Sequence, residues 1–296
     1  MLRLIERPDP NLLVRIAGAS RAIVSWNASA PAGGIALVAH RADGSVSAPL
    51  LYVRWSPDER RSLDGADLKT RIAVDVVRSE VPLSGIGIES TVPLDAIAVA
   101  TPPSPRARTM RRRNAPVLDV PALSQYVPGY RHEQGWCSAA SIAMLLRYHG
   151  RSAHVPEVAR CVYDASYGGT GNWTFNAAYA GQRGLRAAIA YLRGLDHAAA
   201  FVAAGLPVAL SIAWTRGQLP GAPLEQSDGH LVVLRGLDGA IAHVNDPAHP
   251  AVVTDYPRAE LDAIFRAHGG VAYLVAPRER TAELAALANA ERLTAT

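Results

Sequence analysis

Apolar and polar positions alternate in short runs over the first hundred residues. Gly, Pro, Asn and Asp residues separate neighbouring runs, as they do between strands joined by turns. The most strand-like segments are 12–16, 22–26, 35–39, 50–55 and 72–77. Their spacing is typical of an all-β sandwich. We therefore expect residues 1–100 to form an accessory β-sandwich domain that carries no catalytic residues of its own.

The pattern changes beyond residue 117, where apolar residues begin to recur at helical intervals. The clearest helix covers 138–148, and Gly150 follows it as a stop signal. We expect further helices near 156–164, 174–182, 196–204, 258–268 and 278–288. We expect strands at 207–214, 230–235, 240–245, 251–255 and 270–275. Helices that precede antiparallel strands are typical of an α+β fold.

A stretch rich in proline and arginine separates the two patterns. Its prolines lie at 102, 103, 105 and 116, and its arginines at 106, 108, 111, 112 and 113. An arginine run can bind nucleic acid or anionic lipid. Because the run lies among prolines and the net charge is only +4, we favour a solvated linker and expect no nucleic-acid partner. The predicted organisation is a domain at 1–100, a linker at 101–116 and a domain at 117–296.

The apolar runs also bear on membranes and location. None approaches the roughly 20 residues that a membrane-spanning helix needs, so we expect no membrane span. Residues 1–8 lack the apolar stretch and cleavage site of a secretory signal. This favours a cytoplasmic protein, although a secreted protein whose signal had been removed would look the same.

The two cysteines, Cys137 and Cys161, do not form a Cys-x-x-Cys pair. A structural zinc site or a thioredoxin-like motif is therefore not expected. A disulfide between them stays open and would consume a candidate nucleophile. Cys137 stands directly before the predicted helix at 138–148, where unpaired N–H groups and the helix dipole stabilise a thiolate. The alternative is a buried cysteine that acts as a small apolar residue.

His230 and Asp246 flank a predicted hairpin whose turn signal is at 236–239. A three-residue loop at 237–239 would set His230 directly opposite Asp246, with both side chains on one face of the hairpin. A strict two-residue turn at 238–239 would send the two side chains to opposite faces. A histidine beside a carboxylate can act as a base toward a thiol, so we favour the three-residue loop.

Several stretches in this order resemble the bacterial peptidases related to the bacteriocin-processing, double-glycine peptidases of the papain-like superfamily. They are 120–125, 135–141, 171–180, 229–233 and 244–248, and the resemblance spans about residues 118–276. It implies a papain-like cysteine peptidase domain that cleaves peptide bonds through a thioester acyl-enzyme. It also implies a peptide or protein substrate and no cofactor. A β-sandwich before such a domain resembles a common arrangement in these proteins.

The resemblance also implies roles for single residues. Cys137, His230 and Asp246 take the catalytic positions, and an upstream glutamine would complete the oxyanion hole. Gln125 follows the segment that resembles the family's glutamine-bearing stretch and is favoured over Gln134. Two features depart from the family pattern, namely Ser138 where glycine is often found and the irregular spacing of the glutamine.

Other interpretations of the sequence stay open. The glycine-rich chain at 168–173 could wall a substrate groove, which makes Asn172 and Trp173 candidate substrate-binding residues. An amidase or acyltransferase with the same triad, or a peptide-binding module without turnover, would show a similar pattern. A metal site from Asp246 and the histidines at 230, 243 and 249 has no known signature spacing, so we expect no bound metal.

Overall fold

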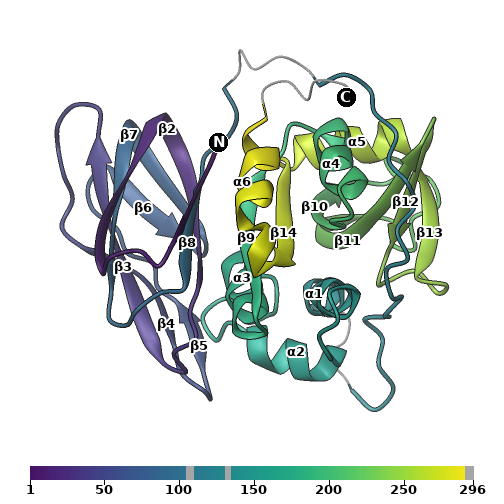
Figure 1. Ribbon diagram of the computed structural model, residues 1–296, viewed down its shortest axis with the longest axis horizontal. Coiled ribbons are helices and arrows are strands. Elements are labelled where there is room, and N and C mark those ends of the chain that lie inside the picture. The colour runs from purple at the N-terminus through teal and green to yellow at the C-terminus, as the bar shows by residue number, and fades with distance from the viewer. Residues whose placement is uncertain (105–109, 131–134, 291–296) are drawn as a thin grey trace.

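The computed structural model describes residues 1–104, 110–130 and 135–290. Its strands form two antiparallel sheets, one in the N-terminal part of the chain and one in the C-terminal part (Figure 1). The helices of the described ranges follow the first sheet in the sequence and surround the second. The structure thus confirms a mixed fold of helices and antiparallel strands.

The N-terminal sheet contains β1 (Leu2–Glu6), β2 (Asn11–Asn27), β3 (Gly33–Arg41), β4 (Leu50–Trp55), β5 (Arg60–Ser62), β6 (Thr70–Ala73), β7 (Val76–Ser90) and β8 (Ala96–Ala100). The strand order is β1-β8-β2-β7-β3-β4-β5, and β6 pairs with β7. Hydrogen bonds join these strands into one sheet, so a sandwich of two sheets stays a prediction. The segments expected at 12–16 and 22–26 are two parts of the long strand β2.

The segment expected at 72–77 is not one strand. Val74, with a φ of 57°, and Asp75 form a turn that separates β6 from β7. A β-branched residue at positive φ is uncommon, and the apolar run gives no sign of such a turn. The prediction of one strand at 72–77 was therefore wrong, because a tight turn divides this segment between two strands.

The C-terminal part contains the helices α1 (Cys137–Tyr148), α2 (Val155–Val162), α3 (Trp173–Gln182), α4 (Leu195–Ala203), α5 (Arg258–Ala267) and α6 (Thr281–Asn289). Its strands are β9 (Leu185–Tyr191), β10 (Val208–Trp214), β11 (Ser227–Asp238), β12 (Ile241–Asn245), β13 (Val253–Pro257) and β14 (Val271–Pro277), in the order β13-β12-β11-β10-β14-β9. The predicted helices and strands are present, with ends shifted by at most three residues, but β9 was not predicted. Within the described ranges, each helix is too short or too polar to cross a membrane.

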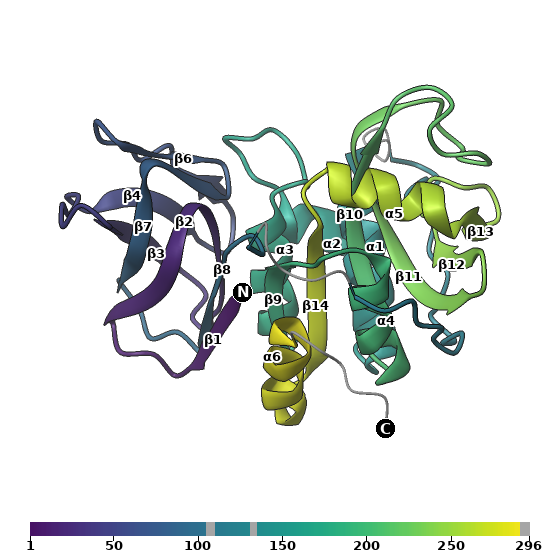
Figure 2. The same cartoon turned by 90° about the horizontal axis from the view of Figure 1, so that it is seen from above.

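Helix α3 joins the two sheets (Figure 2). Phe175 of α3 is fully buried in the same apolar cluster as Trp26 and Tyr52 of the N-terminal sheet. The rings of Phe175 and Trp26 meet edge to face, with centroids 5.7 Å apart. On its other side, α3 packs in the core of the C-terminal part through Ala177 and Ala180. The apolar core of the N-terminal sheet is therefore completed by a helix of the C-terminal part.

Strand β9 lies at the edge of the C-terminal sheet, and β2 covers that edge. The Asn27 side chain accepts a hydrogen bond from the backbone N–H of Ala187 at 3.1 Å and donates to its carbonyl at 3.0 Å. The Ser25 hydroxyl accepts from the N–H of Ile189 at 3.0 Å. Asn27 and Ser25 are fully buried. Side chains of one sheet thus satisfy the backbone groups that the edge of the other leaves unpaired.

The described end of the predicted linker lies against the C-terminal part. Ala115 exchanges two backbone hydrogen bonds with Leu237 of β11, at 2.9 and 3.1 Å. The Arg113 carbonyl accepts from the Arg258 guanidinium at 2.6 Å. Arginines 106 and 108 lie outside the described residues. Ala115 is therefore bound to β11 and Arg113 to the first residue of α5, while the linker as a whole stays a prediction.

Candidate active site

Cys137 is the first residue of α1, so the helix begins one residue earlier than the sequence predicted. It is partly exposed, and its thiol is free. The preceding residue, Trp136, makes no side-chain hydrogen bond to the start of the helix, and the first turn holds no acidic residue. The first N–H groups of α1 thus face a thiol at the positive end of the helix dipole.

His230 of β11 and Asp246, which follows β12, form a buried hydrogen-bonded pair. The distance between His230 Nε2 and Asp246 Oδ1 is 2.7 Å, and the two residues are 2% and 0% exposed. Oδ1 also accepts from the N–H of Ala248 at 2.9 Å, and Oδ2 accepts from the Tyr256 hydroxyl at 2.6 Å. The carboxylate is therefore fixed by three different donors.

The hairpin that carries this pair differs from the predicted one. Asp238 pairs with Ile241, so the turn contains two residues and not the expected three. A bulge between Leu234 and Gly236 then shifts the register by one, so that Val233 pairs with Asn245. The shift puts Asp246 on the same face as His230, two residues along from its direct partner. The three-residue loop was wrong, and the bulge provides the alignment instead.

Gly236 explains where the bulge forms. A Cβ atom at Gly236 would lie 2.9 Å from the Cα of Val117, because the chain before α1 runs closely along β11 at this point. The N–H of Leu118 donates to the Arg235 carbonyl at 2.7 Å. Only glycine permits this close approach. The register of the hairpin therefore depends on a segment more than a hundred residues earlier in the chain.

The thiol and the imidazole shift each other's proton affinity. Burial alone would raise the pKa of Cys137, but hydrogen bonding to His230, the imidazolium charge and the N–H groups of Leu231 and Ser138 lower it below its ordinary value. Burial would likewise lower the pKa of His230, but hydrogen bonds to Asp246 and Cys137 raise it well above its ordinary value. The two opposite shifts favour a thiolate–imidazolium pair near neutral pH.

Asp246 stays ionised beside this pair. Burial opposes its charge, but the hydrogen bond and charge of His230 lower its pKa, with help from the Tyr256 hydroxyl and the N–H of Ala248. Tyr256 lies in β13 and was not among the residues predicted from the sequence. The only available signal was a tyrosine in the strand next to β12, which does not by itself identify a contact.

Trp214 of β10 covers His230 from one side. The centroids of the two rings are 5.7 Å apart, and the rings meet edge to face at 75°. The indole N–H donates to the Leu224 carbonyl at 3.3 Å, and the side chain is almost fully buried. Trp214 therefore keeps water away from the His230–Asp246 pair, which strengthens their interaction.

The structure places Gln125 beside the turn that follows Asp246. Gln125 is 1% exposed, and its backbone N–H donates to the Pro247 carbonyl at 2.9 Å. The alternative residue, Gln134, lies outside the described residues. The next residue, Tyr126, is exposed, and its pKa is raised first by desolvation and then by the charges of Asp246 and Cys137. The segment that carries Gln125 thus lies close to the candidate site.

Asn172 caps helix α3, and its role in substrate binding stays a prediction. It is fully buried at the start of α3, where its Oδ1 accepts from the N–H groups of Thr174 and Phe175 at 3.0 and 3.2 Å. Its Nδ2 donates to Asp164 at 2.9 Å. Both polar atoms of this side chain thus take part in holding the start of α3. Trp173 is partly buried, and its role in substrate binding stays a prediction.

His243, His249 and Cys161, the other candidate ligands and thiol, have side-chain surroundings of their own. His243 pairs with Asp255 at 2.7 Å, and the His249 ring accepts from the N–H of Ala251 at 3.2 Å. In the described ranges, no three His, Cys, Asp or Glu side chains converge as metal ligands would. Cys161 of α2 is a free thiol, so the disulfide that the sequence left open is absent between these two described cysteines.

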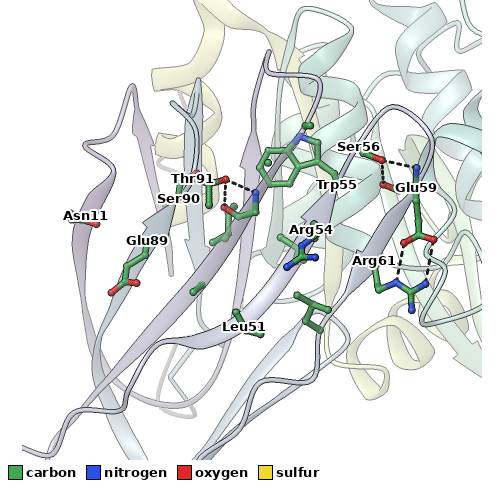
Figure 3. A pocket seen from close by; sticks show the side chains of 17 residues that line it. Asn11, Leu51, Arg54, Trp55, Ser56, Glu59, Arg61, Glu89, Ser90 and Thr91 are labelled. Carbon is green, nitrogen blue, oxygen red and sulfur yellow. Dashed lines mark hydrogen bonds and ion pairs between the residues drawn. The ribbon is translucent and has the colours of Figure 1, made fainter.

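A cavity of about 700 Å³ lies on the N-terminal sheet, over β3 and β4 (Figure 3). Trp55, Arg54 and Leu51 line it, and Arg61 at its side pairs with Glu59 at 3.1 Å. Its lining includes no cysteine or histidine. The cavity therefore contains none of the residues of the candidate site and is separate from the site around Cys137.

Comparison with known proteins agrees with the geometry of the C-terminal part. A family model described as the Peptidase_C39 like family matches residues 117–273, more than half of the chain. The chain therefore belongs to the Peptidase_C39-like family. No curated protein matches the chain.

Similar solved structures come from the same class of proteins. One is a protein from Bacillus anthracis described as a C39-like peptidase, with 18% identity and a TM-score of 0.40. The alignment covers 56% of the present chain and 99% of the Bacillus anthracis chain. A double glycine motif protease from an AMS/PCAT transporter, solved with its leader peptide, has 22% identity, a TM-score of 0.39 and the same coverage. The peptidase domain of Streptococcus ComA, a bifunctional ABC transporter in a quorum-sensing pathway, has 16% identity and a TM-score of 0.39, and it covers 53% of this chain and 98% of that chain.

Proposed function

We propose that the protein is a cysteine peptidase that hydrolyses peptide bonds with Cys137 as nucleophile, His230 as general base and acid, and Asp246 as the residue that orients His230. The observation that carries this proposal is the buried His230–Asp246 pair, with 2.7 Å between Nε2 and Oδ1, in a site that also holds the free, partly exposed thiol at the start of α1. The opposite directions in which the pKa values of Cys137 and His230 are shifted support it. A thiolate at the start of a helix beside an imidazolium is the activated form of a cysteine nucleophile.

The reaction follows from this arrangement. The Cys137 thiolate attacks the carbonyl carbon of the scissile bond and forms a tetrahedral intermediate. His230 donates its proton to the leaving amine as the C–N bond breaks, which leaves a thioester on Cys137. His230 then takes a proton from water as the water attacks the thioester. The acid product leaves, and the thiolate forms again.

Asp246 contributes through His230. Its bond to Nε2 sets the tautomer and orientation of the ring and stabilises the imidazolium. The same bond leaves Nδ1 as the ring nitrogen that can exchange a proton with the thiol. We also propose that Gln125 donates to the oxyanion of the tetrahedral intermediate, as the resemblance implies, with support from its burial beside the Asp246 turn.

The family and the N-terminal sheet together suggest the organisation of the chain. We propose that residues 117–296 form the papain-like peptidase domain and that residues 1–100 form an accessory all-β domain with a sandwich-like core. Its role is to support the peptidase domain through α3 and β9, where the two sheets share buried contacts. The substrate is a peptide or protein, as expected for a peptidase.

The test is hydrolysis of a fluorogenic peptide library by the full chain, with products identified by mass spectrometry. Cys137→Ala is expected to reduce turnover by roughly a thousandfold or more, while Cys161→Ala, which removes the other free thiol, keeps wild-type rates. An electrophilic peptide probe should modify Cys137. Hydrolysis that survives in Cys137→Ala, or is lost in Cys161→Ala, would contradict the assignment.

The same assay addresses the oxyanion donor. Gln125→Ala is expected to lower turnover by roughly a hundredfold and to leave alkylation of Cys137 by iodoacetamide close to wild type, because the thiolate itself does not need this donor. Equal losses of turnover and alkylation would instead indicate a general disturbance of the site.

A further inference from the structure

The loop between α2 and α3 holds the chain on both sides of Cys137 through one residue, Thr170. The Thr170 hydroxyl donates to the Gly135 carbonyl, two residues before Cys137, at 2.8 Å. The Ser138 hydroxyl, one residue after Cys137, donates to the Thr170 carbonyl at 2.7 Å. Thr170 and Ser138 are 2% and 0% exposed. The hydrogen bond between Ser138 and Thr170 is therefore shielded from competing water, while the one to the exposed Gly135 is partly buried.

These bonds hold a helix start that has no side-chain cap of its own. Trp136 at the N-cap of α1 makes no side-chain hydrogen bond to the helix, so the first turn lacks the usual local support. The Ser138 N–H, which lowers the pKa of Cys137, belongs to the same turn. Any movement of residues 135–138 would change both the direction of the thiol and its distance from that N–H. Thr170 is the described side chain that bonds to both ends of this stretch.

The loop that carries Thr170 is itself anchored to the N-terminal sheet. Asp164, which is fully buried, accepts from the N–H of Ser62 in β5 at 3.0 Å and from the Asn172 side chain at 2.9 Å. Its own N–H donates to the Gly169 carbonyl at 2.9 Å, next to Thr170. Asn176 of α3 donates to the Thr170 carbonyl at 2.8 Å. A continuous set of buried hydrogen bonds thus leads from β5 to the turn at Cys137.

We propose that Thr170 is a positioning residue for Cys137 and that the N-terminal sheet, through Asp164, holds the Thr170 loop in place. This inference rests on the proposed role of Cys137 as the nucleophile. It gives the N-terminal sheet a part in the chemistry without any contact to substrate. It also explains Ser138, since a glycine at that position would have no hydroxyl for the Thr170 carbonyl.

The test uses the full chain and two measurements, peptide hydrolysis and the pH profile of Cys137 alkylation. Thr170→Val is expected to lower kcat by roughly ten- to a hundredfold with little change in KM. It should also move the alkylation profile to higher pH, because the thiolate loses well-placed donors. Thr170→Ser keeps the hydroxyl and should restore most of both. The matched control is Thr281→Val, which removes a buried hydroxyl that donates to the Arg278 carbonyl at 2.5 Å and should change neither measurement.

Two more variants complete the design. Ser138→Ala removes the hydroxyl that donates to the Thr170 carbonyl, at a position where alanine suits the helix, and it should shift the alkylation profile in the same direction. Asp164→Asn should shift it by a smaller amount, because Ser62 and Asn172 donate to different carboxylate oxygens and an amide keeps only one of these acceptors. A wild-type profile in Thr170→Val and Ser138→Ala would overturn the positioning role, and a wild-type profile in Asp164→Asn would overturn the role of the sheet. Alkylation of Cys137 does not require peptide hydrolysis, so these outcomes are distinct from a failure of the proposed function. In that case the wild-type protein itself would not hydrolyse peptides.

Discussion

Asp246 is held in the interior by the imidazole of His230, the hydroxyl of Tyr256 and the backbone of Ala248. A buried carboxylate is costly unless each of its oxygens has a donor. Tyr256, from β13, is therefore part of what keeps the charge beside His230. Its hydroxyl is the donor that can be removed with the least change in shape.

Tyr256→Phe tests this contact. The ring is 1% exposed and keeps its packing, while the carboxylate loses one donor, so the pKa of Asp246 should rise and the His230 imidazolium should lose support. We expect kcat to fall by about tenfold and the alkylation profile of Cys137 to move to higher pH. Tyr52→Phe is the control, because it also removes a buried hydroxyl, which donates to the Val24 carbonyl at 2.6 Å. Equal effects of the two changes on kcat would contradict a specific role for Tyr256.

At the scale of elements, α3 receives support from both sheets at its first turn. Asn172 caps it from within the C-terminal part. Asp75, from the turn between β6 and β7, accepts from the N–H of Trp173 at 2.9 Å. Burial raises the pKa of Asp75 to about 7, and the nearby charge of Asp164 adds to this, despite the opposing hydrogen bond from Trp173. The helix is thus held by a carboxyl group whose charge the fold disfavours.

A pH dependence of stability follows from Asp75. The folded protein keeps this proton to a higher pH than the unfolded chain, so its contribution is complete below about pH 4 and is lost as the pH rises to about 7. Asp75→Asn can still accept from Trp173 without ionising. It should leave stability at pH 4 unchanged and raise the free energy of unfolding at pH 8 by up to about 4 kcal/mol, as measured by urea unfolding.

Asp67→Asn, in the same sheet, should change stability in the opposite direction at high pH. Burial opposes the charge of Asp67, but the hydrogen bond from Arg41 lowers its pKa, so its contribution is present above its ordinary pKa and lost as the pH falls. This variant should therefore be less stable than wild type at pH 8. A loss of stability in Asp75→Asn at pH 8 would contradict the proposed protonation of that residue.

The elements also show what the sequence could predict. Helices α1 to α5 follow their apolar spacing, and Cys137, His230 and Asp246 could be proposed together from their motifs. Strand β9 was missed because the alanines at 187, 188 and 190 have little strand preference, and burial between two sheets decides their conformation. The bulge beside Gly236 was missed because it depends on the approach of Val117. Contacts between distant segments leave no periodic signal in a single sequence.

At the scale of the whole molecule, the two sheets are joined by buried contacts. Arg186 of β9 pairs with Glu6 of β1 at 2.5 Å and donates to Asn27 at 3.2 Å, and it is 4% exposed. Together with the ring of Phe175, these contacts make the stability of each sheet depend on the other. We therefore expect the described parts of the chain to unfold in one transition.

Asn27→Ala tests this dependence. It leaves the N–H and carbonyl of Ala187 buried without their partner, which should cost about 1–3 kcal/mol. Both sheets should lose stability together, so tryptophan fluorescence and far-ultraviolet circular dichroism should give one coincident transition at lower urea. Ser29→Ala is the control, because it removes an exposed hydrogen bond to Asp95 and should change stability little. Two separate transitions in the variant would indicate two independent units.

The order in which a ribosome makes this chain gives the covered edge of β9 a further consequence. The segment that forms β2 is synthesised long before β9 emerges. When β9 appears, Ser25 and Asn27 are already available to take up its unpaired backbone groups. An apolar edge strand without such a cover is a template for aggregation. By covering the edge of β9, strand β2 thus protects it from pairing with strands of other chains.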